Sequence, residues 1–578
     1  METSHKQTER KRNITAMLLL LIFIFTTLSL LIYLYPFAST KKETYFSDQH
    51  QILYTGSLYS KTIVKKGNVY IPVSFIKEQL DDAIYVDKKA IIFTTNASIL
   101  HIPLQSEHYY KNNKKVKTDF PIVIEDGKEY YISLDIMTDY LPIKYHITKD
   151  TATIWIEKDG EKYRKGVIKD EKVHKAYLRL RTEPTLLSPY VKEVQANEKV
   201  RIESKEKNYY FVRTVDGIGG YIKKEFVQAG KEVKVKAPSK EEKVVLPKVK
   251  HPISLSWEAV YHKNPKPQSM PKLPGVNVIS PTWFHLKDKK GKVENLASAD
   301  LVKWAKKNKY QVWGLFSNSF DPTLTHEAFS HYQTRKKVID QLVKFSKKYK
   351  LDGINIDIEN VQPEDAELVT QFVREATARL HRAGMIVSMD ITFISTGNWS
   401  EFYEREKLAH VVDYLIVMAY DEHWGGSETA GSVASLPWVE ENLQQLLKIV
   451  PNDKLILGIP LYTRLWAEKS KNGETEITSE ALSMEEAIDW MKKRDVQPVF
   501  DPSSEQHYVE YKDKKKNIVY KMWLEDEISL QKRAEIALKY HLAGVATWAR
   551  AFGNEDAWVT LHQSLEQSKE KKSRGNDI

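Results

Sequence analysis

The chain contains no cysteine, and this absence removes several kinds of chemistry at once. Without thiols it has no disulfide, no thiolate nucleophile and no cysteine-ligated zinc or iron–sulfur centre. Its 17 histidines show neither a His-Glu-x-x-His nor a His-x-x-x-His spacing, and no glycine-rich phosphate loop is present. We therefore predict no metal and no cofactor.

The charge balance also lacks a strong local bias. The chain has 87 Lys and Arg against 77 Asp and Glu, a formal net charge of +10, with both signs spread along its length. No nucleic-acid-binding motif accompanies them, so we expect no nucleic-acid partner. A chain of 578 residues that is 42% hydrophobic is long enough for two to four folded domains.

One long uncharged run lies near the N-terminus. Residues 14–35 are 22 residues without a charge, enough to cross about 30 Å of hydrocarbon as a helix. Basic residues precede this run, which predicts a cytoplasmic tail at 1–13, a transmembrane helix at 14–36 and later domains outside the cytoplasm. A cleaved signal peptide is the alternative, although its apolar core usually spans only about 7–15 residues. We predict a single-pass protein of the cell membrane.

Two modest domains are predicted after the apolar run. Residues 45–160 contain two similar stretches, Gly67-Asn-Val-Tyr-Ile-Pro and Gly127-Lys-Glu-Tyr-Tyr-Ile, which predict a duplicated α+β unit. It resembles the stalk-type N-terminal domain of copper amine oxidases, without catalytic or metal residues. Short alternating runs at 168–228 predict a small β-barrel. This resembles bacterial Src-homology-3-like domains, which either bind wall peptides or serve as passive spacers.

The largest predicted domain follows a linker. The linker, at 229–252, is rich in Lys, Glu, Val and Pro, and a charged tail is expected at 566–578. Between them, in 253–565, short apolar runs alternate with helical periods. The runs predicted as strands are Val276–Ser280, Gln311–Phe316, Gly353–Ile358, Ile386–Asp390, Tyr414–Met418, Leu455–Ile459, Ile518–Trp523 and Gly544–Trp548. Eight βα units predict a TIM barrel, and the long stretch at 463–517 predicts a small α+β insertion.

The third predicted strand ends in a cluster of polar residues. In Asp352-Gly-Ile-Asn-Ile-Asp-Ile-Glu359, alternation places Asn355, Asp357 and Glu359 on one face and three isoleucines on the other. Active sites of TIM barrels lie at the carboxyl ends of the strands, where these acids are expected. Taken alone, the pattern also fits an ion pair with a neighbouring Lys or Arg, or a calcium cluster.

This segment resembles the signature Asp-Gly-x-Asp-x-Asp-x-Glu of glycoside hydrolase family 18, the chitinase family. Further matches follow in order at predicted strand ends: Met418-Ala-Tyr-Asp421, Gly458-Ile-Pro-Leu-Tyr462, Trp523-Leu-Glu-Asp526 and Trp548. Asn355 stands where chitinases usually have Asp, as is often the case in the branch associated with peptidoglycan and spore walls. That difference moves the expected substrate from chitin toward wall glycan.

The resemblance implies a retaining mechanism in which the substrate's own 2-acetamido group attacks. Glu359 would be the acid, Asp357 would bind the acetamide N–H, and Tyr420 would orient the acetamide oxygen. The residues implied in substrate binding are Asn355, Met418, Asp421, Tyr462 and Trp548. Trp283, after the first predicted strand, is a further candidate for a substrate subsite, with capping of the barrel as the alternative. Trp466 and Tyr511 of the insertion are further candidates for stacking on sugars, although a lone aromatic residue is as readily part of a core.

We therefore predict a membrane-anchored glycosidase that cuts β-1,4 bonds in a polysaccharide with 2-acetamido sugars, the peptidoglycan of the cell wall. Hydrolysis of chitin or its oligosaccharides is the second choice. A lectin-like barrel without turnover is a further alternative, which the retained Glu359 argues against and Asn355 keeps open. A structural tether between wall and membrane is the last.

Overall fold

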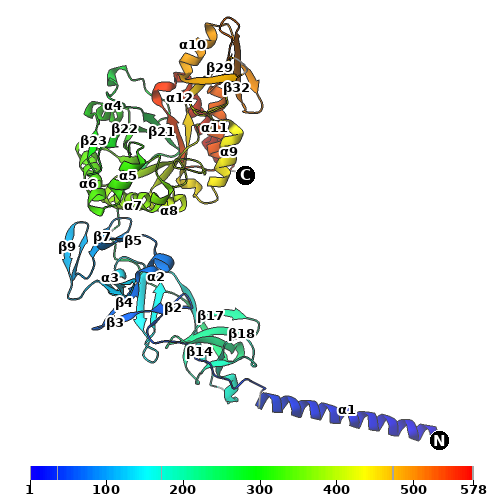
Figure 1. The fold of residues 1–578 in the computed structure, drawn as a ribbon. Helices are drawn as coiled ribbons and strands as arrows, with labels where there is room; N and C mark the ends of the chain where they lie inside the picture. Colours follow the sequence, from blue (N-terminus) through cyan, green and yellow to red (C-terminus); the bar gives the residue numbers. More distant parts are fainter. Residues whose placement is uncertain (1, 35–36, 171, 242, 472–473, 576–578) are drawn as a thin grey trace. The chain divides into compact units, whose positions relative to one another are not determined.

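The computed structural model describes residues 2–34, 37–170, 172–241, 243–471 and 474–575 (Figure 1). The chain forms two compact units. The first comprises Met1–Ile84, Ile102–Tyr109 and Val116–Glu241, and the second comprises Tyr85–His101, Tyr110–Lys115 and Glu242–Ile578.

The N-terminal helix α1 runs from Glu2 to Leu34. Its segment Arg12–Ile32 has a mean hydropathy of 2.6, and it is the one stretch among the described residues that is long and apolar enough to cross a membrane. The helix already begins at Glu2, so it includes most of the predicted cytoplasmic tail at 1–13. Met1 and residues 35–36, the end of the predicted span, lie outside the described residues.

The duplicated region forms short strands in three sheets, ordered β12-β13-β1-β2, β10-β11-β4-β3 and β5-β6-β7-β8-β9. The two similar stretches take equivalent conformations, since β4 leads into the short helix α2 (Val73–Phe75) and β11 leads into α3 (Leu134–Met137). Strands β4 and β11 pair with each other in antiparallel register. The strands are β1 (Gln51–Tyr54), β2 (Ser57–Lys61), β3 (Ile63–Lys65), β4 (Asn68–Pro72), β5 (Ile84–Asp87), β6 (Ala90–Thr94), β7 (Ile99–Pro103), β8 (His108–Lys111), β9 (Lys114–Lys117), β10 (Val123–Asp126), β11 (Glu129–Ser133), β12 (Ile143–Ile147) and β13 (Ile154–Lys158).

The small all-β region is a seven-stranded sheet with the order β16-β15-β19-β18-β17-β14-β20. It is larger than the predicted 168–228, because β14 starts at Lys162 and β20 ends at Lys234. The first residues of the predicted linker, 229–234, therefore belong to a strand that pairs with β14. The strands are β14 (Lys162–Ile168), β15 (Arg179–Arg181), β16 (Tyr190–Glu193), β17 (Lys199–Glu206), β18 (Tyr209–Thr214), β19 (Gly219–Lys223) and β20 (Val227–Lys234).

The second unit contains a closed barrel of eight parallel strands. Strand β21 pairs with both β22 and β34, and this closes the ring. The barrel strands are β21 (Ile253–Glu258), β22 (Val278–Leu286), β24 (Gln311–Ser317), β25 (Gly353–Asp357), β26 (Ile386–Ile391), β27 (Tyr414–Met418), β28 (Leu455–Pro460) and β34 (Gly544–Trp548). The helices of this region are α4 (Ala299–Lys307), α5 (Pro322–Phe329), α6 (Tyr332–Tyr349), α7 (Ala366–Arg382), α8 (Arg405–Val411), α9 (Leu436–Leu446), α11 (Glu527–Lys539) and α12 (Glu555–Gly575). The predicted TIM barrel is confirmed.

Two strand assignments were wrong. The first barrel strand, Ile253–Glu258, was not predicted, so the acidic strand β25 is the fourth of the barrel and not the third. Ile518–Trp523 is β33, which belongs to the insertion and not to the barrel. The insertion is a five-stranded antiparallel sheet with the order β30-β29-β33-β32-β31 and one helix, α10 (Met484–Lys492). Its other strands are β29 (Tyr462–Lys471), β30 (Glu474–Ser483), β31 (Val499–Asp501) and β32 (Gln506–Asp513).

The charged C-terminal segment is helical. Helix α12 continues to Gly575, so most of the predicted tail at 566–578 extends a helix that begins at Glu555. Its first turns are anchored by the buried side chains of Trp558, Leu561 and Leu565. Residues 576–578 lie outside the described part of the chain.

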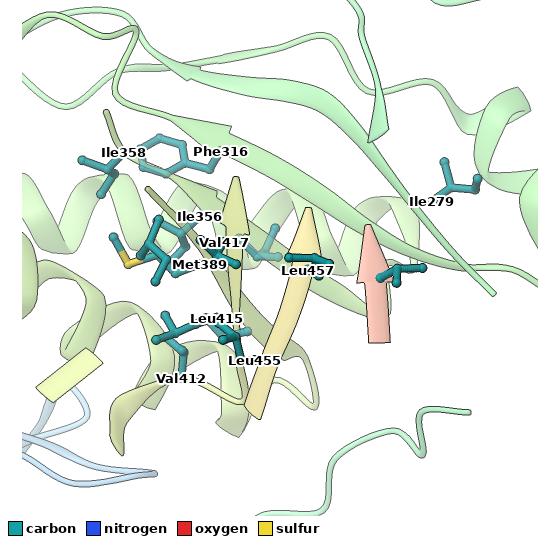
Figure 2. Packing of buried hydrophobic residues seen from close by; sticks show 14 of the residues in the cluster. Ile279, Phe316, Ile356, Ile358, Met389, Val412, Leu415, Val417, Leu455 and Leu457 are labelled. Carbon is teal, nitrogen blue, oxygen red and sulfur yellow. The ribbon is translucent and has the colours of Figure 1, made fainter. Parts of the chain in front are cut away.

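Alternation along the barrel strands separates an apolar layer from a polar one. Ile354, Ile356 and Ile358 are 0% exposed and belong to the large core cluster between the strands and the helices. Figure 2 shows Ile356 and Ile358 packed with Phe316, Met389 and residues of β27 and β28. The positions between them therefore point into the barrel. Near the amino ends of the strands this inner face is apolar, as with Leu255, Val278, Trp313 and Ile416.

Candidate active site

Glu359 is held in place through the main chain on both sides of the barrel strand end. The Asn318 amide donates to the Glu359 carbonyl at 2.7 Å, and its oxygen accepts from the Glu359 N–H at 3.1 Å. The Tyr403 hydroxyl donates to the carbonyl of Ile358 at 2.8 Å. Asn318 follows β24 and Tyr403 precedes α8, so the neighbours on both sides fix the backbone of the acid. Glu359 as a whole residue is half-buried, and the strand before it is buried.

Asn355 lies one layer deeper and is 0% exposed. Its Oδ1 accepts hydrogen bonds from the Trp257 indole N–H at 2.9 Å and the Ser280 hydroxyl at 3.0 Å. Its Nδ2 donates to Oδ1 of Asp390 at 2.8 Å. The amide is therefore locked between three barrel strands, β21, β22 and β26, and works as a fixed connector below the acids.

Asp357 and Glu359 form an unusual acidic pair. Burial raises the pKa of Asp357 well above its ordinary range, and the charge of Asp390 raises it further. Burial also raises the pKa of Glu359, followed by the charge of Asp357 and a hydrogen bond to that carboxyl group. In the part of the chain that the structure describes, neither acid forms an ion pair with Lys, Arg or His. The raised pKa favours the protonated form of Glu359, the form that a general acid needs.

The buried oxygen Oδ1 of Asp357 is also without a hydrogen-bond partner among the described residues. Buried carboxylate oxygens are normally satisfied, and an unpaired one costs free energy. A substrate group that donates a hydrogen bond would satisfy this oxygen. The alternatives of a structural ion pair or a calcium cluster receive no support from the described residues, among which no group of three His, Asp or Glu is placed to hold a metal ion.

The end of β27 brings the next predicted residues to the same face. Tyr420 is partly buried, and burial raises the pKa of its hydroxyl well above the ordinary value, with further contributions from Tyr462 and Asp390. Asp421 adopts the left-handed backbone conformation, φ 63°, which Asp tolerates better than most residues. The Tyr462 hydroxyl donates to Asp421 Oδ1 at 2.6 Å, and the rings of Tyr420 and Tyr462 meet edge to face at 6.4 Å. Met418, at the end of the same strand, is partly buried.

Of the predicted tryptophans, Trp548 lies in the barrel and Trp283 does not. Trp548 is partly exposed at the end of β34 and meets Trp257 edge to face at 6.0 Å. Trp283 is 0% exposed, and its indole donates to Asn264 at 2.7 Å. Because β22 continues through this position to Leu286, the Trp283 ring points into the outer core. The structure therefore does not bring Trp283 to the inner face, where the acids lie. Trp466 is likewise 0% exposed, whereas Tyr511 is partly exposed.

Several residues at this site were not predicted. Asp390 is 1% exposed and joins the acids from β26. Its position at the end of a predicted strand was a signal that was available. Trp257 and Ser280 hold Asn355, and Asn318 and Tyr403 hold the segment of Glu359. These contacts join residues far apart in the sequence, so only the assembled barrel reveals them.

At the carboxyl ends of the barrel strands, a carboxyl group that can hold a proton lies beside a second buried acid. This arrangement is typical of glycosidases with a TIM barrel. Residues 266–553 match Glycosyl hydrolases family 18. The chain is 31% identical over 300 residues to "Uncharacterized glycosylase YvbX" of Bacillus subtilis (strain 168), a match that covers 50% of this chain and 84% of that protein. The chain belongs to glycoside hydrolase family 18 and is a glycosidase.

The chain is similar to further proteins. The chain is 22% identical over 254 residues to the "Cortical fragment-lytic enzyme" of B. subtilis (strain 168), covering 43% of this chain and 58% of that protein. The solved structure of the Bacillus megaterium spore cortex-lytic enzyme SleL matches with a TM-score of 0.49 and 20% identity, over 58% of this chain and 77% of that one. Residues 55–156 match the copper amine oxidase N-terminal domain, as the resemblance of the duplicated region implied.

Proposed function

We propose that this glycosidase hydrolyses β-1,4 bonds of N-acetylglucosamine-containing cell-wall glycan, with the substrate's 2-acetamido group as the nucleophile. The observation that carries the proposal is the pairing of Glu359 and Asp357. Burial and repulsion raise the pKa of both carboxyl groups, and no cation among the described residues is paired with either. Such a pair suits a reaction that begins with proton donation and then develops positive charge.

In the first step Glu359 gives its proton to the glycosidic oxygen while the bond from that oxygen to C1 breaks. The acetamide oxygen of the same sugar attacks C1 and closes an oxazolinium ring. Asp357 accepts a hydrogen bond from the acetamide N–H at its otherwise unpaired Oδ1 and balances the positive charge. The Tyr420 hydroxyl donates to the acetamide oxygen and holds it in line with C1.

In the second step the Glu359 carboxylate takes a proton from a water molecule that attacks C1. The ring opens, the acetamide is restored and Glu359 is protonated again. Two displacements at C1 give overall retention of configuration. Trp548, which is partly exposed, provides aromatic surface beside the reacting sugar. Tyr462 is buried, and its hydroxyl donates to Asp421.

The wall is favoured over chitin by two features. Asn355 replaces one acid of the chitinase signature, and a relative over 43% of this chain is named for lysis of cortical fragments. The apolar helix α1 supports anchoring in the cell membrane with the catalytic domain outside the cytoplasm. The duplicated domain and the small β-barrel would then lie between membrane and wall as spacer or binding modules.

The test compares the full-length chain, purified in detergent, with its Glu359→Gln variant on peptidoglycan and on N-acetylglucosamine oligomers. The wild type should release new reducing ends, and the variant should be slower by about 10³-fold. Glu364→Gln, an exposed change five residues further on, is the matched control and should retain wild-type activity. Equal rates for wild type and Glu359→Gln would refute the proposal.

The same experiment separates the remaining alternatives. Mass spectrometry of the products identifies the sugar at each new reducing end and therefore the bond that is cut. Turnover of oligomers without turnover of peptidoglycan would indicate a chitinase-like substrate. Calorimetric binding of the oligomers without any product would indicate a glycan-binding protein.

A further inference from the structure

The site holds a third buried carboxyl group that the proposed reaction does not use. Asp390 lies near the carboxyl end of β26, and its side chain is 1% exposed. In the register between β25 and β26, the preceding Met389 pairs with Ile356. The next step of this register places Asp390 level with Asp357, on strands about 4.8 Å apart. Two acids therefore face the barrel interior from neighbouring strands.

The hydrogen bonds of Asn355 determine what Asp390 receives. The indole N–H of Trp257 is only a donor, so the atom of Asn355 that it contacts at 2.9 Å must be the oxygen. The amide nitrogen is thereby directed at Asp390, where it donates at 2.8 Å. Asn355 thus orients Asp390 through this hydrogen bond. A side-chain amide cannot ionise or take up a proton as a carboxyl group does, so of these two residues only Asp390 can do so.

The groups around Asp390 are other carboxyl groups and an uncharged amide. Burial raises the pKa of Asp390, the Asn355 amide lowers it and the charge of Glu359 raises it. Asp390 in turn raises the pKa of Asp357. Carboxyl groups whose charges interact in this way titrate as a set, and they lose fewer protons together than they would separately.

No cation relieves this repulsion in the described part of the chain. The ionisable groups that face Asp390 from β25, from the loop before α8 and from the end of β27 are Asp357, Glu359, Tyr403 and Tyr420. Arg405, the cation next to Tyr403, donates instead to the carbonyls of Thr392 and Phe393. Without a cation, the negative charge of Asp357, Glu359 and Asp390 is limited by protons that these carboxyl groups share.

We propose that Asp390 is the partner acid of Asp357 and shares a proton with it during turnover. The inference rests on the proposed function, because in the proposed reaction Asp357 must become negatively charged. When Asp357 becomes the anion that balances the oxazolinium ion, its proton moves to the Asp390 carboxylate. The proton returns when water opens the ring, so only O–H bonds change and no co-reactant is needed. Because Asp390 is buried and acts through Asp357, it is a positioning residue.

The network offers a matched set of variants. Asp390→Asn removes the charge and leaves an oxygen that can still accept from Asn355. The double variant Asn355→Asp/Asp390→Asn moves the acid to the neighbouring strand. In it, Asp at position 355 still accepts from Trp257 and Ser280, and Asn at position 390 donates to it. The charge and the number of hydrogen bonds are then those of the wild type.

The first readout is the pH profile of kcat for the full-length chain. Activity requires protonated Glu359, so its pKa sets the alkaline limb. Removing the negative charge at position 390 lowers the pKa of Glu359. The alkaline limb of Asp390→Asn should therefore move to lower pH by about one unit or more, and kcat should fall by no more than about tenfold. The double variant should return the limb to the wild-type position. An unmoved limb in Asp390→Asn, with or without a fall in kcat, would overturn the proposal.

The second readout needs no catalysis. A buried carboxyl with a raised pKa stabilises the fold at low pH, and this contribution is lost as pH rises through the raised pKa. The melting temperature of Asp390→Asn should therefore increase relative to wild type between about pH 4 and pH 8, and the double variant should behave like wild type. Parallel curves for all three proteins would overturn proton sharing. If the protein turns over no substrate, the proposed function fails, but the melting curves still test whether Asp390 and Asp357 share a proton.

Discussion

Buried carboxyl groups occur in two different settings in the barrel domain. Glu375 and Arg335 are both 0% exposed and are joined at 2.8 Å. Glu525 receives two hydrogen bonds from Arg533, at 2.6 and 3.0 Å, and others from Ser529 and Gln506. In these pairs each carboxylate has a guanidinium, and its charge is neutralised where it lies.

Among the described residues, no cation is paired with the acids at the mouth of the barrel. Asp357, Glu359 and Asp390 are surrounded by one another, by tyrosines and by the amide of Asn355. A paired carboxylate joins elements of the fold through its cation, whereas neighbouring acids without a cation can exchange protons. We propose that this difference separates structural acids from reactive ones.

Breaking a paired carboxylate should have the largest effect on stability. Arg533→Met leaves Glu525 buried without its cation, and we expect the free energy of unfolding to fall by about 3–5 kcal/mol. Chemical denaturation monitored by tryptophan fluorescence measures this change. The adjacent Lys532→Met breaks only the more exposed pair with Glu505 and should stay within about 1 kcal/mol of wild type. Similar losses in both variants would remove the distinction between buried and surface pairs.

Removing one hydroxyl beside the unpaired acids should affect catalysis and not stability. Tyr420→Phe keeps the ring that meets Tyr462, but it lacks the donor that orients the acetamide oxygen. We expect kcat to fall by about 10²-fold with little change in KM. Tyr414→Phe, at the other end of the same strand, loses a hydroxyl that contacts His251 and should have wild-type kcat. A rise in KM alone in Tyr420→Phe would assign its hydroxyl to binding and not to the transition state.

The same comparison shows what could be predicted from the sequence. The alternation of Asn355, Asp357 and Glu359 with isoleucines was visible, because side-chain direction within one strand follows from local geometry. Which strands are neighbours is not local. Ile518–Trp523 alternates like a barrel strand, yet it pairs with β29 and β32 of the insertion. The contact of Asn355 with Asp390 spans 35 residues, and it depends on the register of two strands that the sequence does not determine.

The aromatic residues divide in the same way. Trp548 ends a predicted strand and also ends β34 in the structure, whereas Trp283 lies beyond the predicted strand Val276–Ser280. The strand continues to Leu286 with a register shift between Thr282 and Phe284. The side chain of Trp283 consequently joins the core outside the barrel, and Trp257 of the unpredicted first strand lies inside it. Strand ends and irregularities depend on tertiary pairing, which short patterns do not encode.

The smallest expected effect is a change in how stability depends on pH when Glu359 is replaced. The pKa of Glu359 is raised by burial and by Asp357, so its stabilising contribution is complete below the pKa of an unfolded glutamate and is lost as pH rises through the raised value. Glu359→Gln does not ionise, and its melting temperature should rise relative to wild type from about pH 4 to pH 8 by a few degrees. The exposed control Glu364→Gln should follow wild type throughout. If Glu359→Gln also follows wild type, Glu359 ionises as freely as a surface carboxylate, and the contrast between paired and unpaired acids loses its catalytic meaning.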